Sequence, residues 1–389
     1  MSSLILKNCQ LYNQPMGRLT NIFIADGQIA AVADEVTEGS AVCIDIGGQI
    51  VSPGFIDIHI QGAGGCDILD GSVKSLRTIS KTLAGFGVTG FLATSVVNPE
   101  RGNAHLKVLA GHWRDDFGGA RILGLHLEGP FINPAKRGGI AESAIYPASE
   151  KRLNEIFDIT ADSLKMMTIA PELKDSREVI DRLQAHGCIP SLGHTAANYQ
   201  QTKRAFDWGI RHVTHVFNAM PPLHHREPGP LLAILDSADV SVQIISDGVH
   251  LHPGIARLLG RSLGFGRCIC ITDGIQAIGL PEGRYEYNGR EYTSRAGVAR
   301  YDDGTLIGTA LALNEIGARF QKFTGCSLEE AVDSISLNPA RLLGLDHRKG
   351  RLQPGYDADL VVMDREFGVK MTLLRGNIIF KNGDFKEQN

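Results

Sequence analysis

The feature that most constrains this chain of 389 residues is a series of eight short apolar runs, separated by stretches compatible with helices. The runs cover residues 54–60, 90–96, 122–127, 165–170, 188–192, 212–217, 242–246 and 268–272. Parallel strands need a crossover connection, usually a helix, so this alternation is typical of an α/β protein with a parallel sheet. On their number alone, the runs fit both a doubly wound open sheet and a closed (β/α)8 barrel.

Polar side chains at the carboxyl ends of these runs favour the barrel over the open sheet. In a (β/α)8 barrel the carboxyl ends of all strands meet at one mouth, and that mouth carries the active site. The polar residues at or just past these ends are His59, Thr94, Glu128, Glu172, His194, His215, Asp247 and Asp273. We therefore predict a (β/α)8 TIM-like barrel that forms a catalytic domain over residues 53–345.

The two ends of the chain carry another pattern, in which short alternating strands are separated by glycine-containing turns. Residues 1–52 and residues 346–389 both show it, and we predict that they pair into one small β-sandwich domain. Residues 284–305 also carry strand signals, with turns at Asn288-Gly289 and Asp303-Gly304. This stretch predicts a hairpin that leaves the barrel.

The charge and cysteine content argue against several classes of protein. Lys and Arg total 39 against 43 for Asp and Glu, and the net charge of −4 gives no long-range attraction to nucleic acid or to an anionic membrane. No apolar run is long enough for a membrane span or a signal peptide, so we expect a cytoplasmic protein. The seven cysteines include no CxxC pair, which argues against a disulfide framework and a thiolate zinc site.

Glu128, His194 and His215 form the best candidate for a metal site, because they follow three different predicted strands. Each residue alone is as well explained as a hydrogen-bonded side chain at a strand end. One carboxylate and two imidazoles that converge on one mouth are instead an open ligand set, which leaves a position for water whose pKa the cation lowers. This ligand set suits one divalent ion of Zn, Fe, Mn or Co.

Asp273 follows the last predicted strand and is the candidate general base. A carboxylate there can take a proton from water and pass it to a departing amine nitrogen. The alternative is a turn-capping Asp before Gly274. In the first strand, alternation places His59 and Gln61 on one face, and an amide is a poorer ligand than an imidazole for a transition metal. A second metal site is therefore impaired, although His59 can still approach the first.

A basic loop beyond the sixth run is the candidate for phosphate binding. It contains Arg226 after two histidines, and a guanidinium can bind phosphate through two hydrogen bonds. The alternative is that Arg226 is an ordinary solvated surface residue. Asn218 and Ala219, which follow His215, can offer amide donors to a ligand, and His250 can bind a sugar hydroxyl or the phosphate.

Several segments spread over nearly the whole chain resemble the N-acetylglucosamine-6-phosphate deacetylases of the amidohydrolase superfamily. They include Leu-His-Leu-Glu-Gly-Pro-Phe, Thr-His-Val-Phe-Asn-Ala-Met-Pro and His-His-Arg-Glu-Pro-Gly. The similar segments are residues 51–57, 125–131, 193–194, 214–221, 224–229, 247–250, 272–273 and 355–360. The resemblance implies hydrolysis of N-acetyl-D-glucosamine 6-phosphate to D-glucosamine 6-phosphate and acetate.

The resemblance also implies roles for individual residues. Glu128, His194 and His215 would be the ligands of one metal ion per subunit, with Zn the first expectation, and Asp273 the catalytic acid and base. Arg226 would reach the phosphate of the neighbouring subunit's substrate, which implies a homodimer. The residues that would contact the substrate are Gly139, Asn218, Ala219, Arg226, His250, Leu306, Ile307, Gly308 and Thr309.

Two positions depart from the family pattern. Relatives with two metals have a second histidine where this chain has Gln61, so the sequence is similar to the branch with one metal. Ile140 stands where relatives have a His or Gln that polarises the acetyl carbonyl.

Three alternative functions remain beside the glucosamine substrate. The galacto epimer of the substrate fits the same motifs. A dihydropyrimidinase-like or isoaspartyl dipeptidase-like hydrolase usually has an HxH motif on the first strand and a metal-bridging Lys on the fourth. Here the first strand has Gln61 in place of the second His, and the fourth strand ends at Glu172 without the Lys. A non-catalytic sugar-phosphate-binding relative should lack a metal ligand or the base, and this chain keeps all four residues.

Overall fold

The computed structural model describes residues 3–36, 41–287, 289–383 and 385–388, and its centre is a parallel sheet of eight strands. The strands are β6 (Phe55–Ile60), β9 (Val88–Ser95), β10 (Arg121–Glu128), β11 (Leu164–Ile169), β12 (Ile189–Leu192), β13 (His212–Val213), β14 (Ser241–Ile244) and β15 (Cys268–Cys270). Each of the eight apolar runs forms one of these strands.

The sheet is rolled into a barrel, as predicted. Strands pair in chain order from β6 to β15, and a parallel bridge between Ile60 and Gly274 joins the first strand to the chain that follows the last. This bridge brings the two edges of the sheet together, which an open doubly wound sheet would not do. The (β/α)8 fold class is therefore confirmed.

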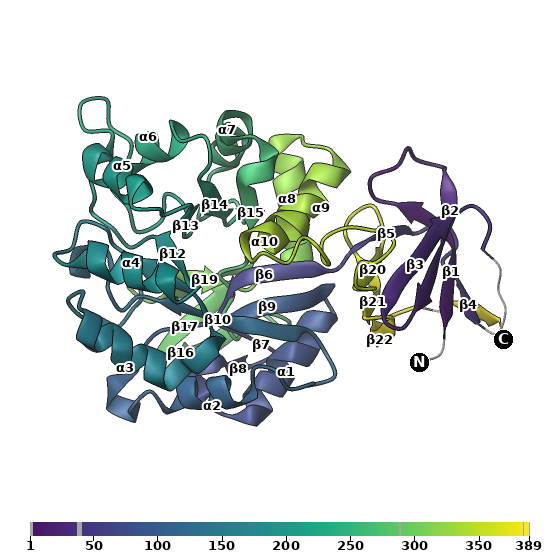
Figure 1. The fold of residues 1–389 in the computed structure, drawn as a ribbon, viewed down its shortest axis with the longest axis horizontal. Helices are drawn as coiled ribbons and strands as arrows, with labels where there is room; N and C mark the ends of the chain where they lie inside the picture. Colours follow the sequence, from purple (N-terminus) through teal and green to yellow (C-terminus); the bar gives the residue numbers. More distant parts are fainter. Residues whose placement is uncertain (1–2, 37–40, 288, 384, 389) are drawn as a thin grey trace.

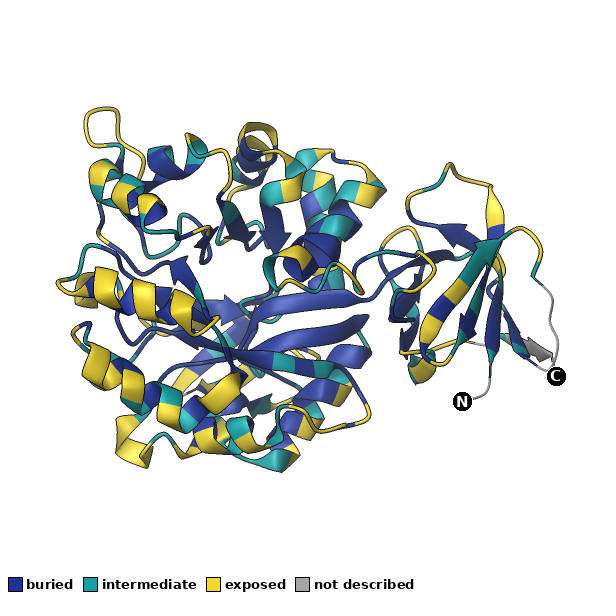
Figure 2. Ribbon diagram, viewed as in Figure 1, coloured by how far each residue is buried: buried dark blue, intermediate teal, exposed yellow. Residues whose placement is uncertain are grey.

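Helices surround the barrel, and most of them bury one face and expose the other (Figures 1 and 2). The α-helices are α1 (Val73–Ala84), α2 (Ala104–His112), α3 (Glu150–Thr160), α4 (Ser176–Ala185), α5 (Tyr199–Asp207), α6 (Gly229–Leu235), α7 (Pro253–Leu263), α8 (Leu313–Thr324), α9 (Leu328–Ile335) and α10 (Leu337–Leu342). Short 3-10 turns are Ile68–Asp70, Pro99–Arg101, Pro134–Lys136, Glu142–Ala144, Ala161–Ser163 and Phe265–Arg267. In α1, the Ser72 side chain caps the first turn, and Leu76, Ile79 and Leu83 recur at helical spacing to form the buried stripe.

Strands from both ends of the chain share one mixed sheet beside the barrel, as predicted (Figure 1). Its strands are β1 (Leu4–Leu11), β2 (Leu19–Ala25), β3 (Gln28–Ala33), β4 (Val42–Asp45), β5 (Ile50–Pro53), β20 (Leu360–Met363), β21 (Val369–Leu374), β22 (Asn377–Lys381) and β23 (Lys386–Gln388). The two ends meet where β5 pairs antiparallel with β20 and where β23 pairs with β4.

The predicted excursion from the barrel is a sheet of four antiparallel strands rather than one hairpin. The strands are β16 (Gly283–Tyr287), β17 (Arg290–Arg295), β18 (Val298–Tyr301) and β19 (Leu306–Thr309), and a two-stranded ribbon, β7 (Gly62–Ala63) with β8 (Cys66–Asp67), follows β6. The turn predicted at Asp303-Gly304 lies between β18 and β19, whereas Asn288 of the other turn lies outside the described residues. A parallel bridge from Gly274 to Thr309 attaches this sheet to the barrel seam.

Among the described residues, no helix is both long and apolar enough to cross a membrane.

Candidate active site

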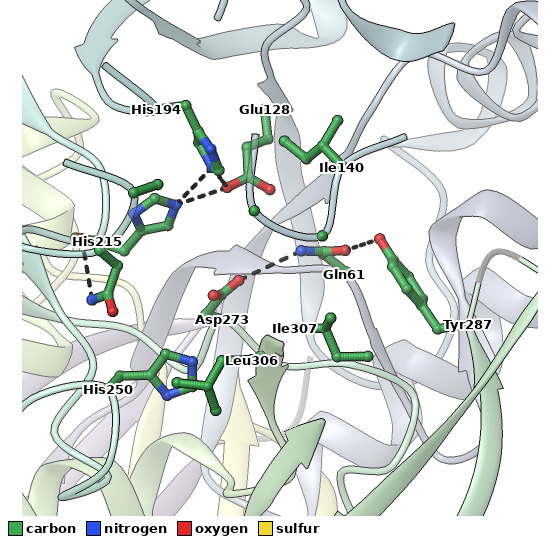
Figure 3. Close-up of a pocket in the computed structure, with 15 residues that line it drawn as sticks. Gln61, Glu128, Ile140, His194, His215, His250, Asp273, Tyr287, Leu306 and Ile307 are labelled. Carbon is green, nitrogen blue, oxygen red and sulfur yellow. Dashed lines mark hydrogen bonds and ion pairs between the residues drawn. The ribbon is translucent and has the colours of Figure 1, made fainter. Parts of the chain in front are cut away.

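A pocket of about 170 Å³ contains most of the residues that the sequence singled out (Figure 3). The carboxyl ends of the barrel strands and the loops after them form it, together with β16 and β19 of the four-stranded sheet. The lining residues are Gln61, Glu128, Gly138, Gly139, Ile140, His194, His215, Asn218, Ala219, His250, Asp273, Tyr287, Leu306, Ile307 and Gly308. Of the predicted site residues, Arg226 and Thr309 do not line it.

Glu128, His194 and His215 converge on one point in this pocket. The Oε1 atom of Glu128 lies 3.0 Å from Nε2 of His194 and 2.9 Å from Nε2 of His215. The two Nε2 atoms are 3.1 Å apart, and all three residues are buried. One donor atom from each residue therefore lies within 4.8 Å of the others, which is the arrangement a metal ion requires.

The second nitrogen of His194 decides what its Nε2 atom presents to the cluster. Nδ1 lies 2.6 Å from the carbonyl oxygen of Lys136, and because a carbonyl only accepts, Nδ1 must donate. In the neutral ring Nε2 then carries a lone pair directed at the cluster, as a metal ligand does. Burial opposes the charge on Glu128, but the charge of His59 and the close contacts with the rings of His194 and His215 outweigh burial and hold the pKa of Glu128 well below its usual value. A buried anion beside the lone pair of His194 fits a divalent cation.

The backbone turns sharply at the residues that enter the pocket. His194, His215 and Asp273 have φ angles of 46°, 23° and 46°, in the left-handed region that residues other than glycine rarely adopt. Such strain persists only where the surroundings hold it, and it gathers at functional sites. Gly193 permits the turn before His194, because a Cβ atom there would lie 2.8 Å from both Thr168 and Thr214.

Asp273 faces the cluster from the seam of the barrel. Its backbone N–H donates to the carbonyl of His59 at 2.9 Å, and its own carbonyl accepts from the N–H of Thr309 at 3.0 Å. Its Oδ1 atom lies 3.2 Å from Nε2 of His59 and 3.5 Å from Nε2 of Gln61. The carboxylate therefore lies in the same pocket as the cluster of Glu128, His194 and His215.

His59 joins Asp273 to the cluster. Its Nε2 atom also lies 3.5 Å from Oε1 of Glu128, and its Nδ1 donates to Oε1 of Gln243 at 2.9 Å. Burial opposes a charge on this ring, but the charges of Glu128 and Asp273 outweigh burial and raise the pKa of His59 to about 9. His59 therefore lies between two carboxylates that favour its charged form.

The family of the chain follows from comparison with known proteins. A sequence model of the amidohydrolase family matches residues 50–278 and 294–379. The chain belongs to the amidohydrolase family. This amidohydrolase is 37% identical over 336 residues to the N-acetylglucosamine-6-phosphate deacetylase of Bacillus subtilis (strain 168), with 85% of each chain covered. It is 34% identical to the N-acetylgalactosamine-6-phosphate deacetylase of Escherichia coli O157:H7, over 91% of this chain and 93% of that one.

Solved structures agree with the sequence comparison. The N-acetylglucosamine-6-phosphate deacetylase of Thermotoga maritima superposes with a TM-score of 0.84 at 33% identity, over 97% of this chain and 100% of that one. A mutant of the Mycobacterium smegmatis enzyme in complex with N-acetyl-D-glucosamine-6-phosphate superposes with a TM-score of 0.89 at 29% identity, over 98% and 99%. The amidohydrolase superfamily is metal-dependent, and in the part of the chain that the structure describes the cluster of Glu128, His194 and His215 could hold a metal ion.

Two residues at the site of this amidohydrolase were not predicted from the sequence. Gln243 is buried, and its Oε1 atom accepts from both His59 and the backbone N–H of His215. A polar residue within the apolar run 242–246 was the available signal for it. Tyr287, at the end of β16, donates to Oε1 of Gln61. No motif pointed to Tyr287, because its contact depends on where the four-stranded sheet folds.

Two predicted site residues of the amidohydrolase, Arg226 and Thr309, and the strand-end residue Glu172 do not line this pocket. Arg226 is exposed, with Nη1 2.8 Å from Nε2 of His225, and lines a separate cavity of about 660 Å³. Thr309 is buried, and its hydroxyl donates to the carbonyl of Thr272 at 2.8 Å. Glu172, at the fourth strand end, accepts from Thr195 and from the backbone of Ala196 outside the pocket. Glu172 also accepts from Nδ2 of Asn133 at 2.9 Å, so its carboxylate links the loop at Asn133 to the loop at Thr195.

Two pocket residues bear directly on ligand binding. His250 is oriented by Asp247, whose Oδ2 accepts from Nδ1 of His250 at 2.6 Å, so that Nε2 remains for a ligand. Ile140 points into the pocket near Glu128, where it offers an apolar side chain and no hydrogen-bond donor (Figure 3).

Proposed function

We propose that this amidohydrolase removes the acetyl group from N-acetyl-D-glucosamine 6-phosphate in amino-sugar catabolism and releases D-glucosamine 6-phosphate and acetate. The observation that carries the proposal is the Glu128, His194 and His215 cluster in one pocket with Asp273. The name shared by relatives over most of the chain supports the substrate. Residues 53–345 are the catalytic domain in this proposal, and residues 1–52 and 346–389 form the small β domain.

Glu128, His194 and His215 hold one divalent cation in this proposal. Zinc is the first candidate because it accepts one carboxylate and two imidazoles with an open position, and Fe, Mn and Co accept the same ligands. When bound, such a cation supplies Lewis-acid chemistry, polarising the amide carbonyl and lowering the pKa of water. A second metal site beside it is impaired, because Gln61 offers an amide where a second imidazole would be needed next to His59.

Asp273 is the proton carrier in the proposed reaction. As a carboxylate it takes a proton from the attacking water, and as an acid it gives that proton to the amine nitrogen, which must be protonated to leave. The carboxylate of Asp273 contacts both His59 and Gln61 through Oδ1. Oδ2 is therefore the oxygen that carries the proton.

The remaining pocket residues bind the sugar in this proposal. Asn218 and Ala219 follow His215 and offer amide donors, while Nε2 of His250 is aimed by Asp247. The other proposed contacts are Gly139, Leu306, Ile307, Gly308 and Thr309, of which Thr309 acts from behind the pocket wall. Arg226 lies outside the pocket of its own chain, which is the placement expected if it binds the phosphate in the partner subunit of a homodimer.

The proposal is tested by measuring acetate release, with the metal content determined on the same preparation. The expected result is a higher kcat/KM for N-acetylglucosamine 6-phosphate than for N-acetylgalactosamine 6-phosphate, and loss of turnover in Asp273→Asn with the metal retained. The galacto epimer is the second candidate, because the E. coli relative that bears its name covers 91% of this chain. Protein with stoichiometric metal that deacetylates neither sugar overturns both assignments.

A further inference from the structure

Three pocket residues from three separate parts of the fold form a continuous hydrogen-bonded chain. The hydroxyl of Tyr287 donates to Oε1 of Gln61, and Nε2 of Gln61 donates to Oδ1 of Asp273 at 3.5 Å (Figure 3). Tyr287 ends β16, whereas Gln61 follows β6 and Asp273 follows β15. The four-stranded sheet therefore reaches the catalytic carboxylate through one intervening amide.

The two ends of this chain determine how the Gln61 amide is turned. A carboxylate only accepts hydrogen bonds, so the end of the amide that faces Asp273 must be the NH2 group. The opposite orientation would set the amide oxygen against a carboxylate oxygen, which is repulsive. With the NH2 group at Asp273, Oε1 faces Tyr287 and needs a donor, and burial, together with the charges of Asp67 and Glu128, raises the pKa of Tyr287 and keeps its proton on. Both ends are satisfied in only one orientation.

The same sheet also holds the backbone of Asp273. The N–H of Thr309, in β19, donates to the carbonyl of Asp273 at 3.0 Å, and the Thr309 hydroxyl donates to the carbonyl of Thr272 at 2.8 Å. Gly308 packs so closely that a Cβ atom there would lie 2.4 Å from the carbonyl oxygen of Asp273. Asp273, whose φ is 46°, is thus held at its main chain by β19 and at its side chain by β16 through Gln61.

We propose that Tyr287 and Gln61 are positioning residues for Asp273. Through them, the four-stranded sheet helps to orient the Asp273 carboxylate. Neither residue exchanges a proton with the substrate in this proposal. Tyr287 turns the Gln61 amide, and the amide holds Oδ1, so that Oδ2 faces the reacting nitrogen and water. The inference rests on the proposed role of Asp273 as proton carrier.

The pocket offers little else for this task. Ile140, on the wall near Gln61 and Glu128, has no polar atom in its side chain (Figure 3). His59 contacts the same Oδ1 atom at 3.2 Å, but it also faces Glu128 and so is shared with the metal ligands. Among the described residues, the Gln61 amide is the contact that links the Asp273 carboxylate to a part of the protein outside the metal cluster.

The test is a double-mutant cycle on the metal-loaded enzyme. Tyr287→Phe removes only the hydroxyl, and we expect kcat to fall about 10- to 100-fold while KM stays within about twofold, because misplaced reacting groups lose rate rather than binding. Gln61→Leu should have at least the same effect. The double variant should be no slower than Gln61→Leu alone, because both substitutions break one chain. The metal content should equal that of wild type in all of them.

Tyr285→Phe is the matched control, since Tyr285 lies in the same strand but donates to the carbonyl of Pro281 at 2.6 Å, away from the pocket. It should turn over like wild type. An unchanged kcat in Tyr287→Phe overturns the proposal, as do additive losses in the double variant. A rise in KM alone would also overturn it, since it would make Tyr287 a substrate contact.

A crystal structure of Tyr287→Phe separates this inference from the proposed function. We expect a displaced or disordered Asp273 carboxylate, with Glu128, His194 and His215 in place. An Asp273 side chain that keeps its position and order overturns the positioning role, whichever sugar the wild-type enzyme accepts. If the wild-type protein releases no acetate but Asp273 is displaced in the Tyr287→Phe variant, the substrate assignment is overturned and the positioning role is retained.

Discussion

The Nε2 atoms of His194 and His215 lie 3.1 Å apart in the pocket, and both face one carboxylate oxygen of Glu128. Two imidazole nitrogens and a carboxylate oxygen that face one another at this distance are stabilised by a shared cation. We therefore predict that chelation abolishes activity and lowers Tm, and that added zinc restores both. Ligand present at a hundred times its Kd stabilises the folded state by about 2.7 kcal/mol. Calorimetry with and without metal measures this shift.

Two carboxamide variants make the metal prediction specific. Glu128→Gln should lose metal and activity together. Glu172→Gln alters a carboxylate at another strand end that lies outside the pocket, so it should keep the wild-type metal stoichiometry. Equal metal content in Glu128→Gln and wild type would remove Glu128 from the ligand set.

Arg226 is predicted to recognise the phosphate group. Hydrogen bonds to charged groups contribute about 1.5–3 kcal/mol, so Arg226→Ala should raise KM for the phosphorylated sugar about 10- to 100-fold. KM for free N-acetylglucosamine should change little. Arg177→Ala, which removes an exposed arginine on α4, is the control and should leave both values unchanged. Equal effects of Arg226→Ala on the two sugars would contradict phosphate recognition.

Mixing two impaired variants, assayed at a substrate concentration below KM, tests whether Arg226 acts across a dimer interface. A dimer of one Asp273→Asn subunit and one Arg226→Ala subunit contains one site with both native residues if Arg226 acts in the partner's site. Equal mixing and subunit exchange should then restore about a quarter of the wild-type activity, because half of the dimers are mixed. Recovery no greater than the sum of the separate variants would place Arg226 in its own subunit's site.

Gly308 is predicted to be required because there is no room for a Cβ atom between it and Asp273. Its φ is 133°, and a Cβ atom would lie 2.4 Å from the Asp273 carbonyl oxygen. Gly308→Ala should therefore lower kcat/KM more than tenfold and reduce the free energy of unfolding by about 1–3 kcal/mol. Gly304, in the turn before β19, has a φ of 86°, and a Cβ atom there would meet no heavy atom within 4 Å. Gly304→Ala should lose only about 1 kcal/mol of stability and keep full activity.

Asp67 is predicted to make stability fall as the pH rises. The residue is buried, its Oδ1 atom accepts from the N–H of Leu69, and Oδ2 has no partner among the described residues. Burial raises the pKa of Asp67 to about 7. Between about pH 4 and that value the folded chain holds a proton that the unfolded chain has lost, so the unfolding free energy falls by up to about 1.4 kcal/mol per pH unit.

Asp67→Asn separates this effect from the helix cap that Asp67 forms. Asn is as good a capping residue as Asp, so the local turn should persist. Urea unfolding at several pH values between 4 and 8 should show a flatter stability profile in the variant. Parallel profiles for variant and wild type would exclude Asp67 as the source.

The sequence predicted the barrel because its repeating unit is local. Each strand and each helix is encoded in a short stretch of apolar periodicity, and a right-handed crossover fixes how one strand follows the next. Once eight such units close, the residues after the strands must meet at one mouth. That is why Glu128, His194, His215 and Asp273 could be named together from the sequence and are brought together in the structure.

Contacts made by loops and by the excursion from the barrel were not predictable in this way. The hydrogen bond of Tyr287 to Gln61 joins residues 226 positions apart. Glu172 follows the same strand-end rule as Glu128, yet it turns to the loop at Thr195 and not to the pocket. Nothing in the local pattern distinguishes these two carboxylates, because the direction of a side chain past a strand end depends on how the next loop packs.

The sequence by itself determined the eight-stranded barrel and placed Glu128, His194, His215 and Asp273 at strand ends that meet at one mouth. It could do so because periodicity and strand order place residues without reference to distant side chains. Only the tertiary structure decided that His59 lies between Glu128 and Asp273 and that Ile140 forms an apolar wall. Tertiary packing likewise placed β19 against Asp273 and β16 against Gln61. The physical reason is that such contacts depend on how loops pack against the barrel, which no short stretch of sequence encodes.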